Sequence, residues 1–375
     1  TSDYYRAEVE EWVAKFNAGR PADAWWDKPW ERLRPDLDYA KYSSPDDAPG
    51  EGLGVYQGRV FPHPLNGGLN EIGERYYEAV YNSPFSNELL WSLAKTAITE
   101  NRLGADDDVD LLSISFSGND AVGHTWGPDS QEALDTTLRS DAIVAEILKT
   151  LDEKVGAGRY LVALTADHGV CPLTQYSAAH GVDASRMPSD QLREGADRML
   201  TAKFFPNETQ PKKWIAASDN NWHYLNQAVV QAAQAETAAV ESELANWLMQ
   251  QPGVAKAYTR TAFINHTLPD DEFAKAASLS FDADRCGDVM IVLQPNWLWV
   301  YGDNSGTTHG SPHPYDTWVP LVVFGHGVKP GNRQEKVAPL TIGPIFSQAL
   351  GFPAPAQTEF PAPANLWKTE AKNAK

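Results

Sequence analysis

Three short stretches of the sequence combine aspartate or histidine with glycine in a way that could bind a metal ion. The first contains Asp120 and His124, four residues apart in SFSGNDAVGHTWGPDS. The second is Asp167-His168 in TADHG, and the third places His309 in GTTHGSPHP. Carboxylate oxygens and imidazole nitrogens suit Zn²⁺, which binds them at roughly 2.0–2.2 Å. Each stretch alone is typical of a loop or a helix cap, but their combination favours a metal site.

Strands and helices are needed to bring these stretches together. Near-continuous apolar runs, typical of strands buried on both faces, occur at Val109–Phe116, Tyr160–Thr165, Asp288–Leu293 and Val319–Phe324. The first two end just before the first two motifs, and ligands in open α/β sheets bind at the carboxyl ends of strands. Between them, Gln131–Glu153 has a helical apolar stripe, with Asp129 and Ser130 as its expected cap. We therefore expect an α/β fold with a mostly parallel central sheet flanked by helices.

The composition narrows the class of protein further. The chain has 375 residues and a net charge of −19, which argues against nucleic-acid binding because phosphates would be repelled. It contains no apolar run long enough to span a membrane. Its two cysteines, Cys171 and Cys286, are too few for a thiolate metal site. Cys171 is expected to be buried, or paired with Cys286 if the protein is exported.

Changes in amino-acid composition along the chain predict four segments. Residues 1–171 are expected to form the first part of the core, and residues 172–285 an inserted cap subdomain. Residues 286–352 are expected to return to the core, with a closing helix at Ile342–Leu350. Residues 353–375, rich in proline and alanine and then in lysine, predict a loosely attached tail.

In their order, the motifs NDAVGHTWGP, TADHG and GTTHGSPHPYDTWVPLVVFG resemble those of the alkaline phosphatase superfamily. The similar branch is that of the single-domain bacterial alkaline phosphatases, which share a core with nucleotide pyrophosphatase/phosphodiesterases. The resemblance runs from the opening YYRAEVEEWVAKFN to about Gly351. It implies an alkaline phosphatase-like α/β core with an inserted cap, and two zinc ions in each complete active site.

The resemblance also assigns the metal ligands by position. Asp120, His124 and His309 would bind one zinc ion, and Asp167 with His168 would bind the other. His313 is the alternative to His309 in the third motif. His309 is preferred because it fills the Thr-His-Gly position.

The sequence departs from the family in its first part. Members carry a further zinc-binding aspartate after their first core strand, followed by the Thr or Ser nucleophile and the residues that hold the substrate phosphate. None of these is found before Val109, so the chain resembles the C-terminal two-thirds of such a protein. The nucleophile and the substrate-binding residues therefore stay unknown. An N-terminal segment or a second chain is expected to complete the site.

The implied function is zinc-dependent hydrolysis of small phosphate monoesters, through a phosphorylated Thr or Ser that lies outside this chain. A phosphodiesterase or nucleotide pyrophosphatase of the same superfamily is the nearest alternative, because both activities share the metal ligands. A catalytically inactive metal-binding fragment is another. A metal-free α/β binding module would require the three motifs to be accidental. The relatives implied by the resemblance are mostly periplasmic or secreted, which predicts the same location here.

Overall fold

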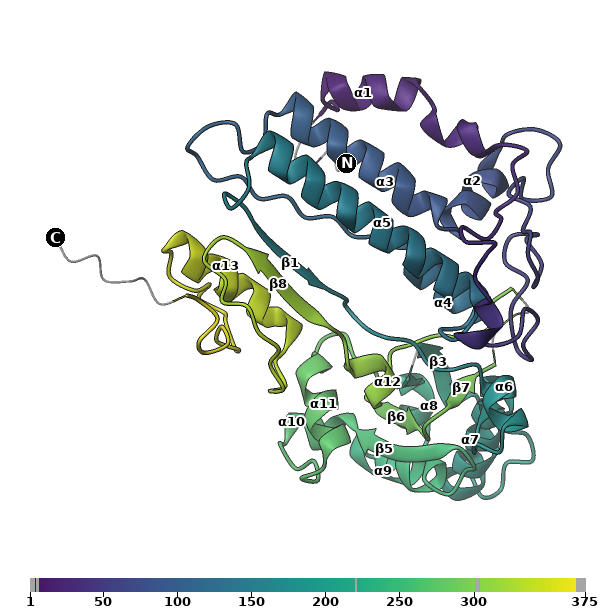
Figure 1. Ribbon diagram of the computed structural model, residues 1–375. Coiled ribbons are helices and arrows are strands. Elements are labelled where there is room, and N and C mark those ends of the chain that lie inside the picture. The colour runs from purple at the N-terminus through teal and green to yellow at the C-terminus, as the bar shows by residue number, and fades with distance from the viewer. Residues whose placement is uncertain (1–3, 5–6, 220, 301, 303, 369–375) are drawn as a thin grey trace.

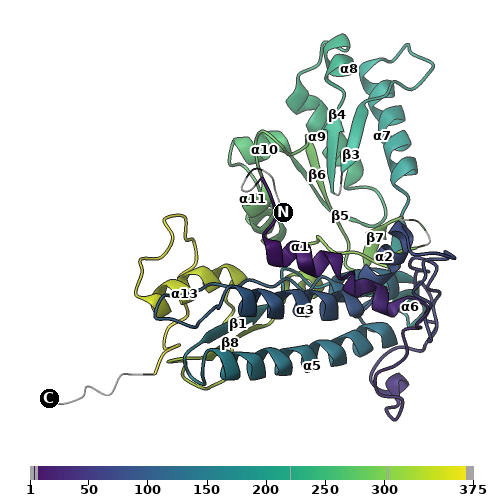
Figure 2. The same ribbon diagram turned by 90° about the horizontal axis from the view of Figure 1, so that it is seen from above.

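The computed structural model describes residues 4, 7–219, 221–300, 302 and 304–368, and it places a layer of helices beside two regions of sheet (Figures 1 and 2). The helical layer comes first in the chain and is coloured purple to teal. Its elements are α1 (Glu11–Ala18), η1 (Pro21–Trp25), η2 (Tyr39–Lys41), α2 (Glu74–Tyr81), α3 (Phe85–Glu100), α4 (Gly118–Trp126) and α5 (Gln131–Lys154). With the strands described below, these helices confirm the predicted α/β class.

Helix α5 forms where the sequence predicts a helix. The Ser130 hydroxyl oxygen accepts a hydrogen bond from the backbone N–H of Ala133 at 3.1 Å, which satisfies one of the free donors of the first turn. The predicted apolar stripe is not the buried side of this helix, however. Leu134 is only half-buried, whereas Glu132 and Asp135 are fully buried. The N-terminal segment of the chain covers the polar side of α5, so its apolar side stays partly open.

Two of the predicted strands form, and they pair with each other. They are β1 (Leu161–Thr165) and β8 (Leu321–Gly325), which run antiparallel with Leu161 opposite Gly325. Helix α13 (Ile342–Leu350) forms as predicted and lies beside them in Figure 1. Both strands match the apolar runs that indicate them, because such runs depend on local sequence alone.

The strand pairing differs from the predicted mostly parallel sheet. Among the described strands, only β2 (Ser185–Met187) and β7 (Trp297–Trp299) pair in parallel. Three further short helices are α6 (Thr174–Ala179), which contacts β2, α12 (Pro314–Thr317), and η3 (Pro339–Thr341), which contacts α13.

Residues 109–116, predicted to be a buried strand, form no strand in the described part of the chain. Ile114 and Phe116 pack against a cluster contributed by α3 and α5. In contrast, Val109 and Leu111 are 67% and 78% exposed. An apolar run indicates burial, but a ladder also needs a neighbouring strand to receive its hydrogen bonds. The described residues supply no such neighbour here.

The second half of the chain builds a four-stranded antiparallel sheet in the order β3-β4-β6-β5 (Figure 2). Its strands are β3 (Ile215–Asp219), β4 (Trp222–Leu225), β5 (Val254–Thr259) and β6 (Val289–Leu293), and its helices are α7 (Ser189–Phe204), α8 (Gln227–Ala232), α9 (Thr237–Leu248), α10 (Arg260–Ile264) and α11 (Glu272–Ser280). The apolar run at Asp288–Leu293 predicts a strand of the core sheet, but β6 lies between β4 and β5. All five of its residues are buried, and an apolar run of this kind does not say which sheet buries it. The division of the chain at residues 171, 285 and 352 stays a prediction.

The predicted tail, residues 353–375, is attached where it is described. Val328, just after β8, forms an antiparallel bridge with Trp367, and Leu366 is buried. Residues 369–375 lie outside the described residues. The end of the described tail is therefore attached to the core at Leu366 and Trp367.

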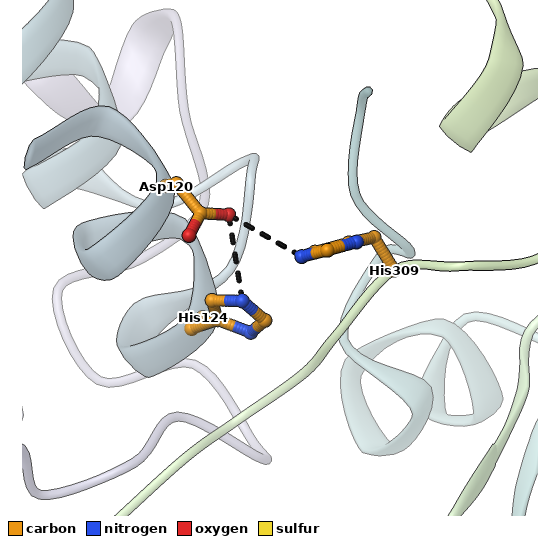
Figure 3. A group of neighbouring side chains, drawn as sticks. All are labelled: Asp120, His124 and His309. Carbon is orange, nitrogen blue, oxygen red and sulfur yellow. Dashed lines mark ion pairs between the residues drawn. The ribbon is translucent and has the colours of Figure 1, made fainter. Parts of the chain in front are cut away.

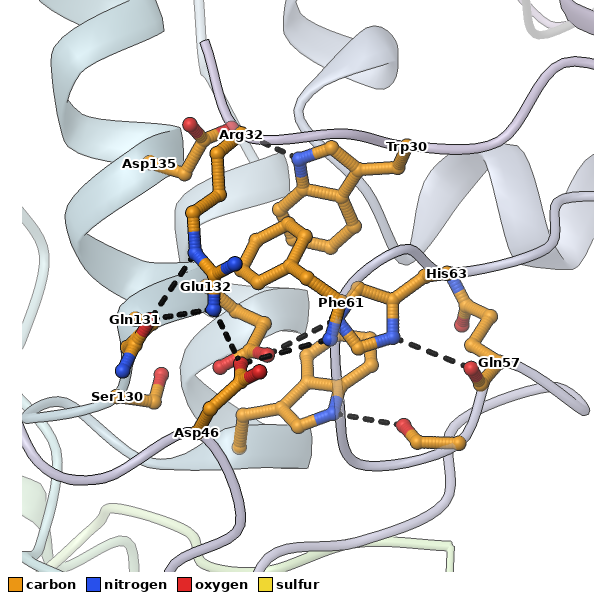
Figure 4. Close-up of polar contacts among 12 residues, drawn as sticks. Trp30, Arg32, Asp46, Gln57, Phe61, His63, Ser130, Gln131, Glu132 and Asp135 are labelled. Carbon is orange, nitrogen blue, oxygen red and sulfur yellow. Dashed lines mark hydrogen bonds and ion pairs between the residues drawn. The ribbon is translucent and has the colours of Figure 1, made fainter. Parts of the chain in front are cut away.

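A buried polar network attaches the N-terminal segment to α5 (Figure 4). His63 and Glu132 are fully buried, and Nε2 of His63 lies 2.9 Å from Oε1 of Glu132. The other ring nitrogen of His63 lies 3.1 Å from the backbone oxygen of Gln57. The Arg32 guanidinium group donates twice to the side-chain oxygen of Gln131. These contacts fix the segment before α2 against α5.

The buried carboxyl group of Glu51 makes the free energy of unfolding depend on pH, and this dependence can be tested. Glu51 is 2% exposed, and among the described residues neither of its carboxyl oxygens has a hydrogen-bond partner. Burial, followed by the negative charge of Glu132, raises the pKa of Glu51 to about 9, against 4.5 in the unfolded chain. Between these two values the unfolded chain ionises first, so the free energy of unfolding falls as the pH rises, by at most about 1.4 kcal/mol per unit.

The variant Glu51→Gln is expected to lack this contribution, because its side chain does not ionise. Urea unfolding of both proteins at about pH 5.5 and about pH 8.5 measures the difference. Between the lower and the higher pH, the free energy of unfolding should fall more for the wild type than for the variant. Free energies of unfolding that change in parallel would contradict the buried, neutral carboxyl group.

Candidate metal centre

Helix α4 places the first two candidate ligands on one face. Asp120 lies in its first turn and His124 in its last, and residues four apart in a helix are neighbours on its surface. Oδ1 of Asp120 lies 3.4 Å from Nε2 of His124 (Figure 3). Helix α4 by itself therefore brings the side chains of Asp120 and His124 together.

The loop before His309 is docked onto the end of α4. The backbone N–H groups of Gly306 and Thr307 both donate to the carbonyl oxygen of His124, at 2.8 and 2.9 Å. A Cβ atom at position 306 would lie 2.6 Å from the backbone oxygen of Thr125, so only glycine allows this close approach. The docked loop brings His309 across to the helix.

Asp120, His124 and His309 form one group with the geometry of a metal site. Nε2 of His309 lies 3.6 Å from Oδ1 of Asp120, and one ligand atom from each residue lies within 4.8 Å of the others. Two ligands of a tetrahedral zinc ion are roughly 3.4 Å apart, given ligand distances near 2.1 Å. The donor set and its spacings therefore fit zinc. The three side chains are 38%, 29% and 27% exposed, so a small molecule can reach them.

The second predicted pair lies next to this group. The ring of His168 stacks on the ring of His309, with centroids 3.4 Å apart and planes 15° from parallel. The side chain of Asp167 is 87% exposed, and its Oδ2 lies 3.5 Å from Nε2 of His168. Among the described residues no third metal-ligating side chain joins these two. The structure thus brings all five candidates together, as one group of three and an adjacent pair.

The surroundings of His309 favour its neutral imidazole. Burial lowers the pKa of His309, and the nearby rings of His168 and His124 lower it further, against an opposing effect of Asp120. A histidine must be unprotonated at the nitrogen that binds a metal. The surroundings of His309 therefore favour the form that a metal requires.

Three residues considered from the sequence lie outside this group. His313, the alternative to His309, is 3% exposed, and its Nε2 lies 2.9 Å from the backbone oxygen of Leu293. Cys171 and Cys286 are both free, so the pairing considered from the sequence is not formed. Burial raises the pKa of the Cys171 thiol to about 12, which makes it an inert packing residue.

Sequence reasoning missed two residues that support the ligands. The carbonyl oxygen of Thr307 lies 2.9 Å from Nδ1 of His124, and Thr307 is fully buried. Asp316 is buried close to His309 and His168, whose charges act on its carboxyl group. Burial raises the pKa of Asp316, while hydrogen bonds from Ser311 and these two histidines lower it. Both residues belong to the third motif, but only the folded structure shows what they contact.

Known proteins resemble this chain over most of its length. The family model of type I phosphodiesterase / nucleotide pyrophosphatase matches residues 9–316. Alkaline phosphatase PafA of Elizabethkingia meningoseptica is 30% identical over 357 residues, covering 95% of this chain and 63% of the relative. Alkaline phosphatase PhoV of Synechococcus elongatus is 29% identical over 359 residues, covering 95% and 62%. The chain therefore spans less than two thirds of the length of these curated relatives.

A solved structure supports the same relationship. The crystal structure of wild-type alkaline phosphatase PafA is similar with a TM-score of 0.86 and 29% identity, covering 98% of this chain and 68% of that one. This match confirms the alkaline phosphatase-like α/β fold. Since the family model covers most of the chain, this protein belongs to the type I phosphodiesterase / nucleotide pyrophosphatase family, within the alkaline phosphatase superfamily.

Proposed function

We propose that this chain carries the metal-binding part of a zinc-dependent enzyme that hydrolyses phosphate monoesters, as alkaline phosphatases do. The observation that carries the proposal is the group Asp120, His124 and His309, with its spacings of 3.4 and 3.6 Å. Zinc held there would act as a Lewis acid on phosphoryl oxygens and lower the pKa of an attacking water. The Thr or Ser that becomes phosphorylated lies, on this proposal, outside residues 1–375.

The residues of the chain hold the ligands ready for this chemistry. The Nδ1–H of His124 donates to the carbonyl oxygen of Thr307, which leaves the lone pair of Nε2 directed at the site. The hydroxyl group of Thr307 donates in turn to the backbone oxygen of Cys171 at 2.7 Å. The loop that carries His309 is thereby linked to the segment after His168. Ligands fixed in this way lose little freedom when a metal binds.

A second zinc ion is proposed at Asp167 and His168, with a further ligand from a segment outside this chain. The exposed apolar residues of the two-stranded sheet support such a segment. Leu164 of β1 is 40% exposed, and Val322 and Phe324 of β8 are 53% and 50% exposed. A sheet with an open apolar face and an unpaired edge normally receives another element. A strand from the completing segment would cover both.

Metal analysis of the purified chain tests this division of ligands. We expect about one tightly bound zinc ion per chain, at the three-ligand group, because the two-ligand pair alone binds weakly. Hydrolysis of p-nitrophenyl phosphate is expected only when the completing segment is present. Turnover by residues 1–375 alone would contradict the external nucleophile. A completed protein that binds zinc without hydrolysing the ester would support an inactive metal-binding protein instead.

A phosphodiesterase or nucleotide pyrophosphatase is the second candidate, because the family model carries that description. The two activities share their metal ligands and differ in how the remaining phosphate oxygens are held. Rates with p-nitrophenyl phosphate and bis-p-nitrophenyl phosphate separate them. A higher kcat/KM for the diester would favour the second candidate.

The proposed partners are small phosphate esters, and the net charge of −19 disfavours nucleic acids. None of the helices in the described part of the chain combines the length and apolar character that crossing a membrane requires. A periplasmic or secreted location follows from the resemblance alone and stays a prediction. Fractionation of cells that produce the protein tests it.

A further inference from the structure

The three imidazoles of the candidate metal centre differ in what their Nδ1 atoms contact. Nδ1 of His124 lies 2.9 Å from the carbonyl oxygen of Thr307, and Nδ1 of His168 lies 2.9 Å from that of Gly169. His309 turns its Nε2 toward Asp120 (Figure 3). Among the described residues its Nδ1 has no hydrogen-bond partner. Among these three histidines, His309 is therefore the one whose tautomer no hydrogen bond within the described part of the chain fixes.

Whereas Nδ1 of His309 lacks an acceptor among the residues that the structure describes, one carboxylate oxygen of Asp316 lacks a donor there. Asp316 is 4% exposed, and its Oδ2 accepts hydrogen bonds from the backbone N–H and the hydroxyl group of Ser311, at 2.8 and 2.5 Å. Its Oδ1 is buried and has no hydrogen-bond partner within the described chain. A buried carboxylate oxygen without a donor costs free energy, so it marks a place where a donor is expected. The charges of His309 and His168 act on this carboxyl group.

The backbone places Asp316 at the junction of the two segments that carry these histidines. Its carbonyl oxygen accepts the N–H of Gly169 at 2.8 Å, next to His168. Its side chain holds Ser311, two residues after His309. A Cβ atom at position 169 would collide with the backbone oxygen of Tyr315, so glycine is required for this close contact. Asp316 is therefore connected to both halves of the centre.

We propose that Asp316 is a positioning residue, whose Oδ1 accepts the Nδ1–H of His309 once Nε2 binds a metal. A metal-ligating histidine commonly donates its other ring N–H to a carboxylate, which fixes the tautomer and makes the ring a stronger ligand. His168 is the poorer donor, because its Nδ1 is already occupied by Gly169. The inference rests on the metal-binding part of the proposed function and not on hydrolysis.

The variant Asp316→Asn tests the contact selectively. The backbone N–H of Ser311 requires an acceptor at the Oδ2 position, so the amide oxygen is expected there and the NH₂ group faces His309. Two donors then oppose each other, and His309 is driven toward the wrong tautomer. Zinc affinity, measured by competition with a chelator, is expected to fall 10- to 100-fold. The matched control Ser311→Ala removes one donor to Oδ2 and keeps Oδ1, so its affinity should change less.

NMR of the zinc-bound chain with ¹⁵N-labelled histidine gives a readout that a merely structural role would not move. The wild type should show His309 protonated at Nδ1, with a low-field hydrogen-bonded proton that Asp316→Asn loses and Ser311→Ala keeps. A wild-type His309 protonated at Nε2 would overturn the proposal, and this measurement needs no variant to fold. Unchanged zinc affinity in Asp316→Asn, or an equal loss in Ser311→Ala, would also overturn it. A wild-type chain that binds no zinc would instead defeat the proposed function.

Discussion

Replacing Asp120 with alanine is expected to remove zinc from the three-ligand group and to slow hydrolysis by at least roughly a thousandfold. Its Oδ1 lies 3.4 Å from Nε2 of His124 and 3.6 Å from Nε2 of His309, so it contacts both imidazoles of the group. Without this carboxylate the group keeps two neutral ligands and loses the negative charge that offsets the cation. The fold should persist, because the side chain of Asp120 is 38% exposed.

The measurement is zinc content together with phosphate ester hydrolysis in the protein that includes the completing segment. Asp129→Ala is the matched control, since Asp129 is exposed between α4 and α5 and its replacement changes the net charge equally. The control should keep both zinc and activity. His309→Ala should behave like Asp120→Ala. If Asp120→Ala and His309→Ala both retained zinc and full activity, the proposed function would fail.

Local patterns in this sequence predict local structure well. The cap at Ser130 and the periodic stripe after it locate α5, and the apolar runs locate β1 and β8. These signals are carried by residues close together in the chain. They do not say which side of α5 is covered, because that depends on the distant segment around His63. The buried side of α5 consequently carries Glu132 rather than the leucines.

Strand pairing could not be predicted in the same way. Residues 109–116 and β6 have similar apolar runs, yet the first forms no strand in the described chain and the second is the fully buried interior strand of a sheet. The difference lies in the partners, which come from remote parts of the sequence. β6 finds β4 and β5 beside it. Residues 109–116 have no described neighbour, so the same composition leaves Leu111 exposed.

The candidate ligands could be found from the sequence because each lies in a short motif of characteristic residue types. The preference for His309 over His313 came from its Thr-His-Gly position in the sequence, and the structure places His313 elsewhere, against Leu293. The supporting residue Asp316 gave no signal of its own. Its significance comes from a buried oxygen without a donor, and a sequence does not reveal that kind of defect.

The second large effect is expected at Asp135, a buried carboxylate of α5 that is 0% exposed (Figure 4). Its Oδ1 accepts hydrogen bonds from the backbone N–H of Leu33 and the hydroxyl group of Tyr39, both at 2.6 Å. Its Oδ2 accepts from Nε1 of Trp30 and Nε of Arg139, both at 2.8 Å. Asp135→Ala would leave these donors buried without an acceptor and is expected to lower the free energy of unfolding by about 3–5 kcal/mol.

Urea unfolding of the two proteins measures this loss, with Asp141→Ala as the control, because Asp141 is an exposed aspartate of the same helix. The control should change stability by less than about 0.5 kcal/mol. A loss below about 1 kcal/mol for Asp135→Ala would mean that water replaces the carboxylate as acceptor. Both variants keep Asp120, His124 and His309. Zinc at the three-ligand group should therefore raise the stability of both variants by the same amount, since binding stabilises whichever folded protein retains the site.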